Sequence, residues 1–277
     1  MTSAFSVRSE RRVFEGTQGF YEHPSVACAG PMRFGVFLPK RAATARVPAL
    51  YFLAGLECTE ETFAIKAGAQ RVANELGLAI VTSDTSPRAA RFPGDDASWD
   101  FGQGAGFYVD ATEQPWAGAY RMETWVTQEL RAVVEASFPV RDDVRGIFGH
   151  SMGGHGALTL ALRHPALYRS VSAFAPIAAP SRVPWGTKAF THFFGAASPA
   201  WAAHDAVALL ESGKAFPTKP LVDQGTADKF LAEQLRPELL GDAVTLRLRE
   251  GYDHSYWFVQ SFVEDHLRHH AQVLSAS

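Results

Sequence analysis

The sequence contains few of the features that mark secreted, membrane or nucleic-acid-binding proteins. Its only cysteines, Cys28 and Cys58, are too few for a disulfide framework or a four-cysteine metal site. No apolar run approaches the roughly eighteen residues needed to cross a bilayer, and the N-terminus lacks the apolar core of a signal peptide. We therefore expect a soluble cytoplasmic protein with no membrane partner.

An excess of positive charge is also absent. The chain has 26 basic and 29 acidic residues, a net charge of −3, and no long basic block. Nucleic acid is therefore excluded as a partner. The short basic clusters at 8–12 and 266–270 are interpreted as solvated surface. With 47% apolar and 20% charged residues, the composition is that of an ordinary globular protein.

The chain has no internal repeat, low-complexity tract or flexible linker, which predicts a single domain over residues 1–277. Short apolar runs, several of them apolar on both faces, are typical of buried parallel strands. They occur at 32–38, 49–53, 78–82, 144–148, 170–174, 220–222 and 244–248.

Helical spacing of apolar residues separates several of these runs, at 122–138, 157–164 and 255–269. Strands that alternate with helices predict a mostly parallel sheet with helices on both faces. The segments up to about residue 53 follow one another as strands, which predicts an antiparallel N-terminal edge. Two long irregular stretches, 83–121 and 176–199, are expected to form pocket walls, and Trp185 in the second is a possible pocket residue.

The segment GHSMG (149–153) fits the G-x-S-x-G nucleophile elbow. An apolar strand precedes it and a helix follows it, which is the context that the motif requires. Glycines allow the sharp turn that projects the serine hydroxyl at a helix N-terminus, where negative charge is favoured. The motif therefore predicts that Ser151 is a nucleophile in an α/β-hydrolase fold.

A serine nucleophile needs a base, and in this fold the base comes last, after the acid. His254 follows the last strand and a turn, at the edge of the sheet that carries the elbow, so it is the predicted base. His150 is expected to point to the wrong side of the elbow, and both His150 and His155 are assigned to packing. The histidines of the terminal helix are expected to be solvated.

The acid should lie between the serine and the histidine. Asp228 comes three residues after Gly225, in the loop beyond a strand, where a carboxylate can reach the histidine. Asp223 lies in or at the end of that strand and is expected to anchor a loop. Asp253 is expected to point away from its neighbour His254. Asp228 is therefore the predicted acid of the triad.

The tetrahedral intermediate of acyl transfer needs an oxyanion hole. The fold supplies one amide from the residue after the nucleophile, here Met152, and one from the loop after an early strand. Gly55 lets that loop turn, so Leu56 is the candidate for the second donor. Cys58 lies two residues further and is a possible pocket residue, and we hypothesise that its modification blocks access.

Several longer segments carry a resemblance to a known family. They are LAGLECTEETF (53–63), DTSPR (84–88), SWDFGQGAGFYVDAT (98–112), GHSMGGHGAL (149–158), SAFAPI (172–177), PWGTKAF (184–190), DQG (223–225) and GYDHSY (251–256). With these segments, nearly the whole chain resembles the S-formylglutathione hydrolases of the esterase D family.

The resemblance implies a triad on Ser151, Asp228 and His254, with oxyanion amides on Leu56 and Met152. It also implies hydrolysis of S-formylglutathione to glutathione and formate in formaldehyde detoxification, activity on small esters, and often a homodimer. The chain departs from the family pattern at Ala54, where serine is frequent, and at Glu57, where threonine is usual. Glu57 adds a negative charge beside the oxyanion loop.

Other readings share parts of this pattern. A general carboxylesterase of small acyl esters has the same catalytic residues and is the main alternative. An acyltransferase is usually secreted, and a non-catalytic binding module is expected to lose triad members. No H-E-x-x-H motif occurs, and GQGAG (102–106) is not a dinucleotide fingerprint. No metal or cofactor is therefore expected.

Overall fold

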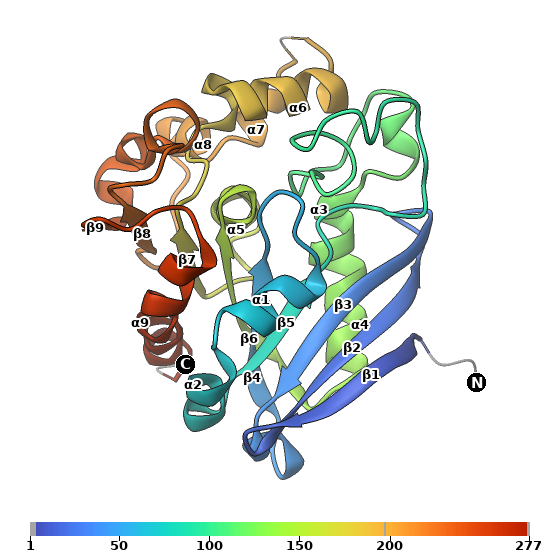
Figure 1. Ribbon diagram of the computed structural model, residues 1–277, viewed down its shortest axis with the longest axis vertical. Helices are drawn as coiled ribbons and strands as arrows, with labels where there is room; N and C mark the ends of the chain where they lie inside the picture. The colour runs from blue at the N-terminus through green and yellow to red at the C-terminus, as the bar shows by residue number, and fades with distance from the viewer. Residues whose placement is uncertain (1–3, 197, 276–277) are drawn as a thin grey trace.

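The computed structural model describes residues 4–196 and 198–275, and its centre is a twisted mixed sheet (Figure 1). The nine strands lie in the order β1-β2-β3-β5-β4-β6-β7-β8-β9. Their bounds are β1 Ser6–Val13, β2 Gly16–Ser25, β3 Gly30–Leu38, β4 Val47–Leu53, β5 Ala79–Ser83, β6 Val140–His150, β7 Ser170–Phe174, β8 Leu221–Gly225 and β9 Thr245–Arg249. From β5 to β9 neighbours run parallel, whereas β1, β2, β3 and β5 pair antiparallel.

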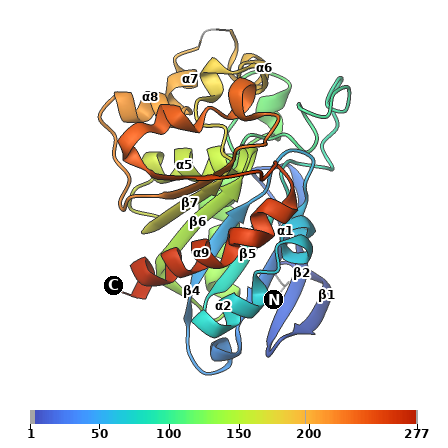
Figure 2. The same cartoon turned by 60° about the vertical axis from the view of Figure 1, so that its left-hand side comes forward.

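Helices cover both faces of this sheet. One face carries α1 (Glu60–Lys66), α2 (Gln70–Leu76) and α9 (Tyr256–Ser275), and Figure 2 shows α9 crossing it. The other face packs against α4 (Arg131–Ser137) and α5 (Met152–Arg163). The mostly parallel sheet, covered on both faces and with an antiparallel edge, confirms the predicted architecture.

α3 (Met122–Thr124) and a π-helical turn (Trp125–Leu130) lead directly into α4, and Trp125 bonds Ser83 of β5. The remaining helices are α6 (Pro184–Phe194), α7 (Ala200–Ala203) and α8 (Ala206–Glu211). Short 3-10 turns span Lys40–Ala43, Trp116–Gly118, Pro180–Arg182 and Pro237–Ala243, and a second π-turn spans Leu231–Leu235. Both views place α6, α7 and α8 together at one end of the molecule (Figures 1 and 2). None of the helices among these described residues is long and apolar enough to span a membrane.

Strand β4 does not lie beside β3, although the two follow each other in the chain. Strand β5 is inserted between them, pairing antiparallel with β3 and parallel with β4. The segments up to residue 53 are consecutive strands and their edge is antiparallel, as expected, whereas β4 itself belongs to the parallel part of the sheet. β4 is apolar on both faces and lies in the covered centre of the sheet, which is typical of a buried parallel strand.

Two expectations are corrected. The stretch 176–199 is not a long loop, because α6 occupies its middle and buries Phe190, Phe193 and Phe194 at helical spacing. The cluster at 266–270 is not solvated surface. His266 and His270 are fully buried against the sheet, where burial lowers the pKa of both imidazoles. By contrast, the stretch 83–121 is mostly irregular, and it packs over the elbow.

Candidate active site

The turn between β6 and α5 holds Ser151 in a strained conformation. Its backbone angles are φ 58° and ψ −120°, a region that side-chain-bearing residues rarely adopt. A Cβ added at Gly149 would lie 2.1 Å from the carbonyl oxygen of Gly153, and one added at Gly153 would lie 2.0 Å from that of Leu53. Both glycines are therefore required by close backbone contact, and the turn presents the hydroxyl at the N-terminus of α5.

Asp228 and His254 come together at the ends of two neighbouring strands. Asp228 follows β8, His254 follows β9, and the two strands are parallel neighbours. His254 Nδ1 lies 2.6 Å from Asp228 Oδ2. The aspartate side chain is fully buried, and it also accepts hydrogen bonds from the Phe230 amide at 2.9 Å and from Gln224 Nε2 at 3.2 Å. These contacts fix the carboxylate, which in turn orients the imidazole.

Ser151 and His254 line the same small pocket, but no hydrogen bond joins them in the described part of the chain. Such bonds are often long in the absence of substrate and shorten in the complex. The two side chains therefore face one space, with the Asp228–His254 pair already formed.

The loop after β4 lies directly against the serine. A Cβ at Gly55 would come within 3.1 Å of Ser151 Cβ, a tight contact that glycine avoids. Among the described residues, neither the Leu56 amide nor the Met152 amide donates a hydrogen bond to the protein. Both amides are free for a ligand, and Leu56 borders the pocket.

The stretch 83–121 holds this loop in place. Tyr108 donates its hydroxyl to the Ala54 carbonyl at 2.8 Å, and the Glu57 amide donates to the Gly104 carbonyl at 2.9 Å. Arg88 Nη2 donates to the Cys58 carbonyl at 3.1 Å. Glu57 itself has a positive φ of 65° and an exposed side chain. The stretch 83–121 therefore holds the loop that carries Leu56 in a fixed position.

The pocket at Ser151 is small, with a volume of about 100 Å³. It is lined by Gly55, Leu56, Cys58, Trp99, His150, Ser151, Trp185, Phe230 and His254. Trp185 is therefore a pocket residue in the structure. Its ring meets Phe230 at 4.7 Å and Trp99 at 5.4 Å between centroids. An aromatic wall and a small volume suit a short acyl group.

Trp99, Phe230 and His150 were not assigned to the pocket by the sequence. Trp99 lies in the segment 98–112, which is rich in glycine and aromatic residues, and this composition could have indicated a pocket residue. Phe230 follows Asp228 by two residues, but no pattern in the sequence reveals the direction of its side chain. Both aromatics reach the pocket from irregular loops, whose course depends on the tertiary fold.

His150 does not point to the wrong side of the elbow. Its ring lies 4.6 Å from that of His254 and 5.5 Å from that of Tyr256, and it borders the pocket. Burial and the neighbouring His254 lower the pKa of His150 well below its ordinary range. His150 is therefore a neutral packing partner of His254, whereas His155 is buried away from the pocket lining and bonds the Phe107 carbonyl.

Cys58 lines the pocket as a free thiol, close to Tyr256. Burial raises the pKa of this thiol above its ordinary value. A raised pKa lowers the fraction of reactive thiolate at neutral pH. The idea that modification of Cys58 blocks the site stays a prediction, and the structure favours slow modification.

The two other aspartates have structural partners. Asp253 lies just before α9 and accepts from the Ser255 amide at 2.9 Å and from the Ser255 hydroxyl at 2.6 Å. Asp223 does not anchor a loop, contrary to expectation. It is fully buried in β8 and pairs with Arg247 of β9 and His266 of α9. It thus ties the last strand and the last helix to the sheet.

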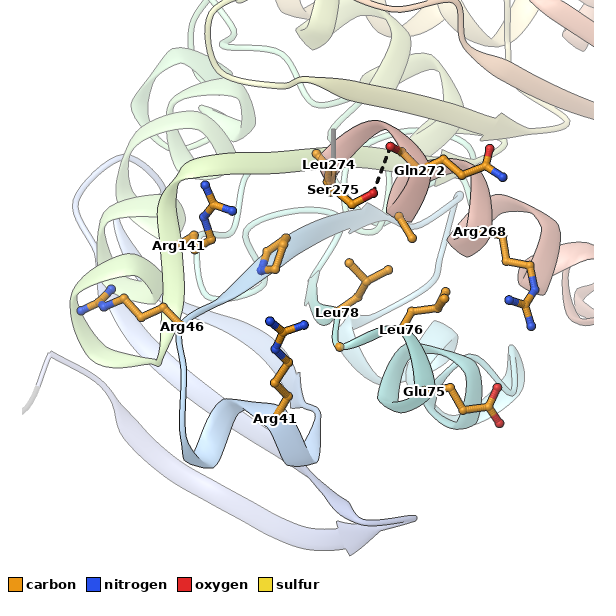
Figure 3. Close-up of a pocket in the computed structure, with 13 residues that line it drawn as sticks. Arg41, Arg46, Glu75, Leu76, Leu78, Arg141, Arg268, Gln272, Leu274 and Ser275 are labelled. Carbon is orange, nitrogen blue, oxygen red and sulfur yellow. Dashed lines mark hydrogen bonds between the residues drawn. The ribbon is translucent and has the colours of Figure 1, made fainter. Parts of the chain in front are cut away.

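The cleft of about 610 Å³ in Figure 3 is much larger and contains none of these residues. It lies at the opposite end of the strands from Ser151, between the starts of β4 and β6 and the end of α9. Four arginines line it, Arg41, Arg46, Arg141 and Arg268. Figure 3 shows Arg41 pointing into the cleft and Arg46 pointing away from it. Arg46 Nη1 donates to the Val140 carbonyl at 2.7 Å. Size alone therefore does not locate the chemistry.

Comparisons with known proteins agree with this geometry. Residues 25–269 match the family described as "Putative esterase". The chain is 49% identical over 276 residues to S-formylglutathione hydrolase of Mus musculus. The aligned residues cover 97% of this chain and 98% of the relative. It is 50% identical over 281 residues to S-formylglutathione hydrolase of Paracoccus denitrificans, with 99% and 100% covered.

A solved structure of an S-formylglutathione hydrolase from Agrobacterium tumefaciens superimposes with a TM-score of 0.94. It is 43% identical and covers 97% of this chain and 99% of that chain. The chain belongs to this esterase family. It is a serine hydrolase with the α/β-hydrolase fold, as the nucleophile elbow predicts.

Proposed function

We propose that this esterase hydrolyses the thioester S-formylglutathione to glutathione and formate, a step in formaldehyde detoxification. The observation that carries the proposal is the identity of 49–50% with S-formylglutathione hydrolases over nearly the whole chain. The small volume of the pocket at Ser151, about 100 Å³, supports an acyl group as small as formyl. The alternative is a general carboxylesterase of small acyl esters.

The proposed triad is Ser151, His254 and Asp228. His254 Nε2 takes the proton of Ser151 Oγ, and Oγ forms a bond to the thioester carbonyl carbon. The negative charge moves to the carbonyl oxygen, where the amides of Leu56 and Met152 bind it. Each such donor typically lowers the barrier by roughly 3–4 kcal/mol. The carbon–sulfur bond then breaks, and glutathione leaves as a thiol with the proton from His254.

Hydrolysis of the formyl-enzyme repeats these steps with water. His254 takes a proton from water, the hydroxide adds to the formyl carbon, and the same two amides hold the oxyanion. The ester bond breaks, Ser151 regains its proton from His254, and formate leaves. Throughout these steps Asp228 accepts a hydrogen bond from His254 Nδ1–H, a role that the 2.6 Å contact supports. No cofactor is required by this chemistry.

The test compares kcat/KM for S-formylglutathione with that for a neutral aryl acetate. We expect the thioester to be preferred by a large factor. A ratio near one or below would favour the general carboxylesterase. Ser151→Ala should abolish both activities while the circular dichroism spectrum stays unchanged. Residual activity above about one thousandth of the wild-type value would contradict the role of Ser151 as the nucleophile.

Two broader assignments belong to the same proposal. Cys28 and Cys58 are free thiols, which supports action in the reducing cytoplasm, where glutathione is available. The family resemblance also supports a homodimer. Light scattering of the purified chain measures the oligomeric state directly, and a mass of one chain would contradict the dimer.

A further inference from the structure

Trp99 is the most exposed aromatic residue in the wall of the pocket at Ser151. It is 49% exposed and lies in the irregular stretch 83–121, whereas Trp185 is buried in α6 and Phe230 is partly buried. The rings of Trp99 and Trp185 meet edge to face, with their centroids 5.4 Å apart. One such contact is weak, so a half-exposed indole on a loop needs further support to keep one position.

Lys188 of α6 binds the residues on both sides of Trp99. Its Nζ donates to Ser98 Oγ at 2.8 Å and to Asp100 Oδ1 at 2.6 Å. The Ser98 hydroxyl also donates to Asp100. These three side chains form a closed set of contacts that fixes the backbone on either side of the indole.

The ion pair between Lys188 and Asp100 is partly shielded from water, because the Asp100 side chain is only 14% exposed. Burial raises the pKa of Asp100, but the hydrogen bonds from Lys188 and Ser98 and the lysine charge outweigh it, so this pKa lies below its ordinary value. The carboxylate is therefore charged at neutral pH. Charge-assisted bonds of this kind are stronger than bonds between neutral groups.

Helix α6 carries one tryptophan of the wall and positions the other. Trp185 and Lys188 are three residues apart, so they lie on one side of the helix. Phe101 adds a second attachment, because its ring packs against that of Phe193 in α6 at 5.2 Å between centroids. The loop that carries Trp99 is therefore held against α6 by polar contacts on each side of the indole and by an aromatic contact beyond it.

We propose that Trp99 limits the size of the acyl group accepted at Ser151 and that Lys188 is the positioning residue that holds Trp99 there. This inference deepens the proposed function and rests on Ser151 as its nucleophile. The pocket has a volume of about 100 Å³ with Trp99 in place, which suits formyl or acetyl. A longer acyl chain has to displace the indole, and the contacts of Lys188 oppose that movement.

The experiment measures kcat/KM for p-nitrophenyl acetate and p-nitrophenyl butyrate, which share a leaving group and differ only in the size of the acyl group. We expect the wild type to prefer the acetate. The butyrate-to-acetate ratio should rise about tenfold in Trp99→Ala, because removal of the indole makes room for two more methylenes. It should rise about threefold in Lys188→Met, which keeps a long side chain and removes its charge. Asp100→Asn weakens the same contact and should shift the ratio in the same direction.

A double variant separates positioning from a general structural effect. If Lys188 acts through Trp99, adding Lys188→Met to Trp99→Ala should leave the ratio at the value of Trp99→Ala, because the wall that Lys188 holds is already absent. Lys188→Arg keeps a charged donor opposite Asp100 and should restore most of the wild-type selectivity.

Two variants serve as controls. Trp257→Ala removes an exposed tryptophan that lines a different pocket, and Arg182→Met removes a surface pair with Glu211 just before α6. Both should keep the wild-type ratio.

An unchanged ratio in Trp99→Ala would overturn the size limit. An unchanged ratio in Lys188→Met, or a further rise in the double variant, would overturn the positioning role of Lys188. The proposed function is tested separately, by the preference of the wild type for S-formylglutathione, and its failure would leave these ester ratios as they are.

Discussion

At the scale of single residues, the site depends on how one imidazole is held. The His254 side chain bonds the buried Asp228 and packs between the rings of His150 and Phe230. Asp228 is held in turn by an amide of its own loop and by Gln224. The tautomer and the direction of His254 are therefore set before any substrate arrives, which is what a base for Ser151 requires.

Asp228→Asn should lower kcat by about a thousandfold to ten-thousandfold without unfolding the protein. The amide cannot stabilise the imidazolium and favours the wrong tautomer of His254. Steady-state kinetics with an aryl acetate measures the loss. Asp253→Asn is the control, because Asp253 adjoins His254 in sequence but bonds Ser255 instead, and its kcat should stay within about twofold. A loss below tenfold in Asp228→Asn would mean that another group orients the histidine.

At the scale of elements, α9 is attached to the sheet by buried polar contacts as well as by apolar packing. His270 Nδ1 lies 2.6 Å from Ser170 Oγ and its Nε2 lies 2.9 Å from Ser172 Oγ, both in β7. His266 contacts Ser172 of β7 through Nδ1 and Asp223 of β8 through Nε2. The helix follows His254 in the chain, so these contacts also fix the segment that carries the proposed catalytic base.

His270→Ala should destabilise the protein by about 2–4 kcal/mol, because it leaves a cavity and removes a hydrogen-bonding partner from two buried serines. Urea denaturation measures the free energy of unfolding. Arg268→Ala, on the exposed side of the same helix, removes only a surface pair with Glu264 and should cost less than about 1 kcal/mol. Equal losses in the two variants would contradict a stabilising role for the buried contacts.

At the scale of the whole molecule, the buried histidines link stability to pH. Burial lowers the pKa of His150, His155, His266 and His270 below the ordinary value of 6.5, to about 3 for His155. Below pH 6.5 the unfolded chain therefore binds protons that the folded chain does not. One acid acts in the opposite direction, since burial raises the pKa of Glu60 from 4.5 to about 7. Glu60 favours the folded state at lower pH.

The free energy of unfolding should therefore fall as the pH is lowered from 7 to 5. Four histidines outweigh one glutamate, and each net proton taken up on unfolding changes the free energy by about 1.4 kcal/mol per pH unit. We expect a total loss on the order of 5 kcal/mol. Urea denaturation at a series of pH values measures it. A flat or rising profile over this range would contradict neutral buried imidazoles, and His270→Leu should show a shallower slope than the wild type.

Much of the site was predictable because chemistry restricts which residues can occupy it. The elbow needs glycines at 149 and 153, and the structure shows backbone contacts at both that exclude any side chain. In this fold the acid and the base follow the nucleophile in the chain, which limits the candidates for both to later residues. The structure places His254 Nδ1 2.6 Å from Asp228 Oδ2. The predicted roles of these residues, of Leu56 and of Met152 stay predictions until variants are measured.

The errors share a cause. His150, His266 and His270 were assigned by their neighbours in the chain, yet their surroundings come from segments about a hundred residues away. Helical spacing at the C-terminus does not reveal which polar residues face the sheet, because a buried serine in β7 makes an imidazole acceptable there.

The sequence by itself determined the reaction class, because a strand–GHSMG–helix pattern is a local arrangement that imposes strain on one serine. Only the tertiary structure decided which side chains surround that serine. The size of the pocket and the aromatic rings that line it arise where segments from distant parts of the chain meet. Such contacts depend on packing across the whole sheet, which no local pattern encodes.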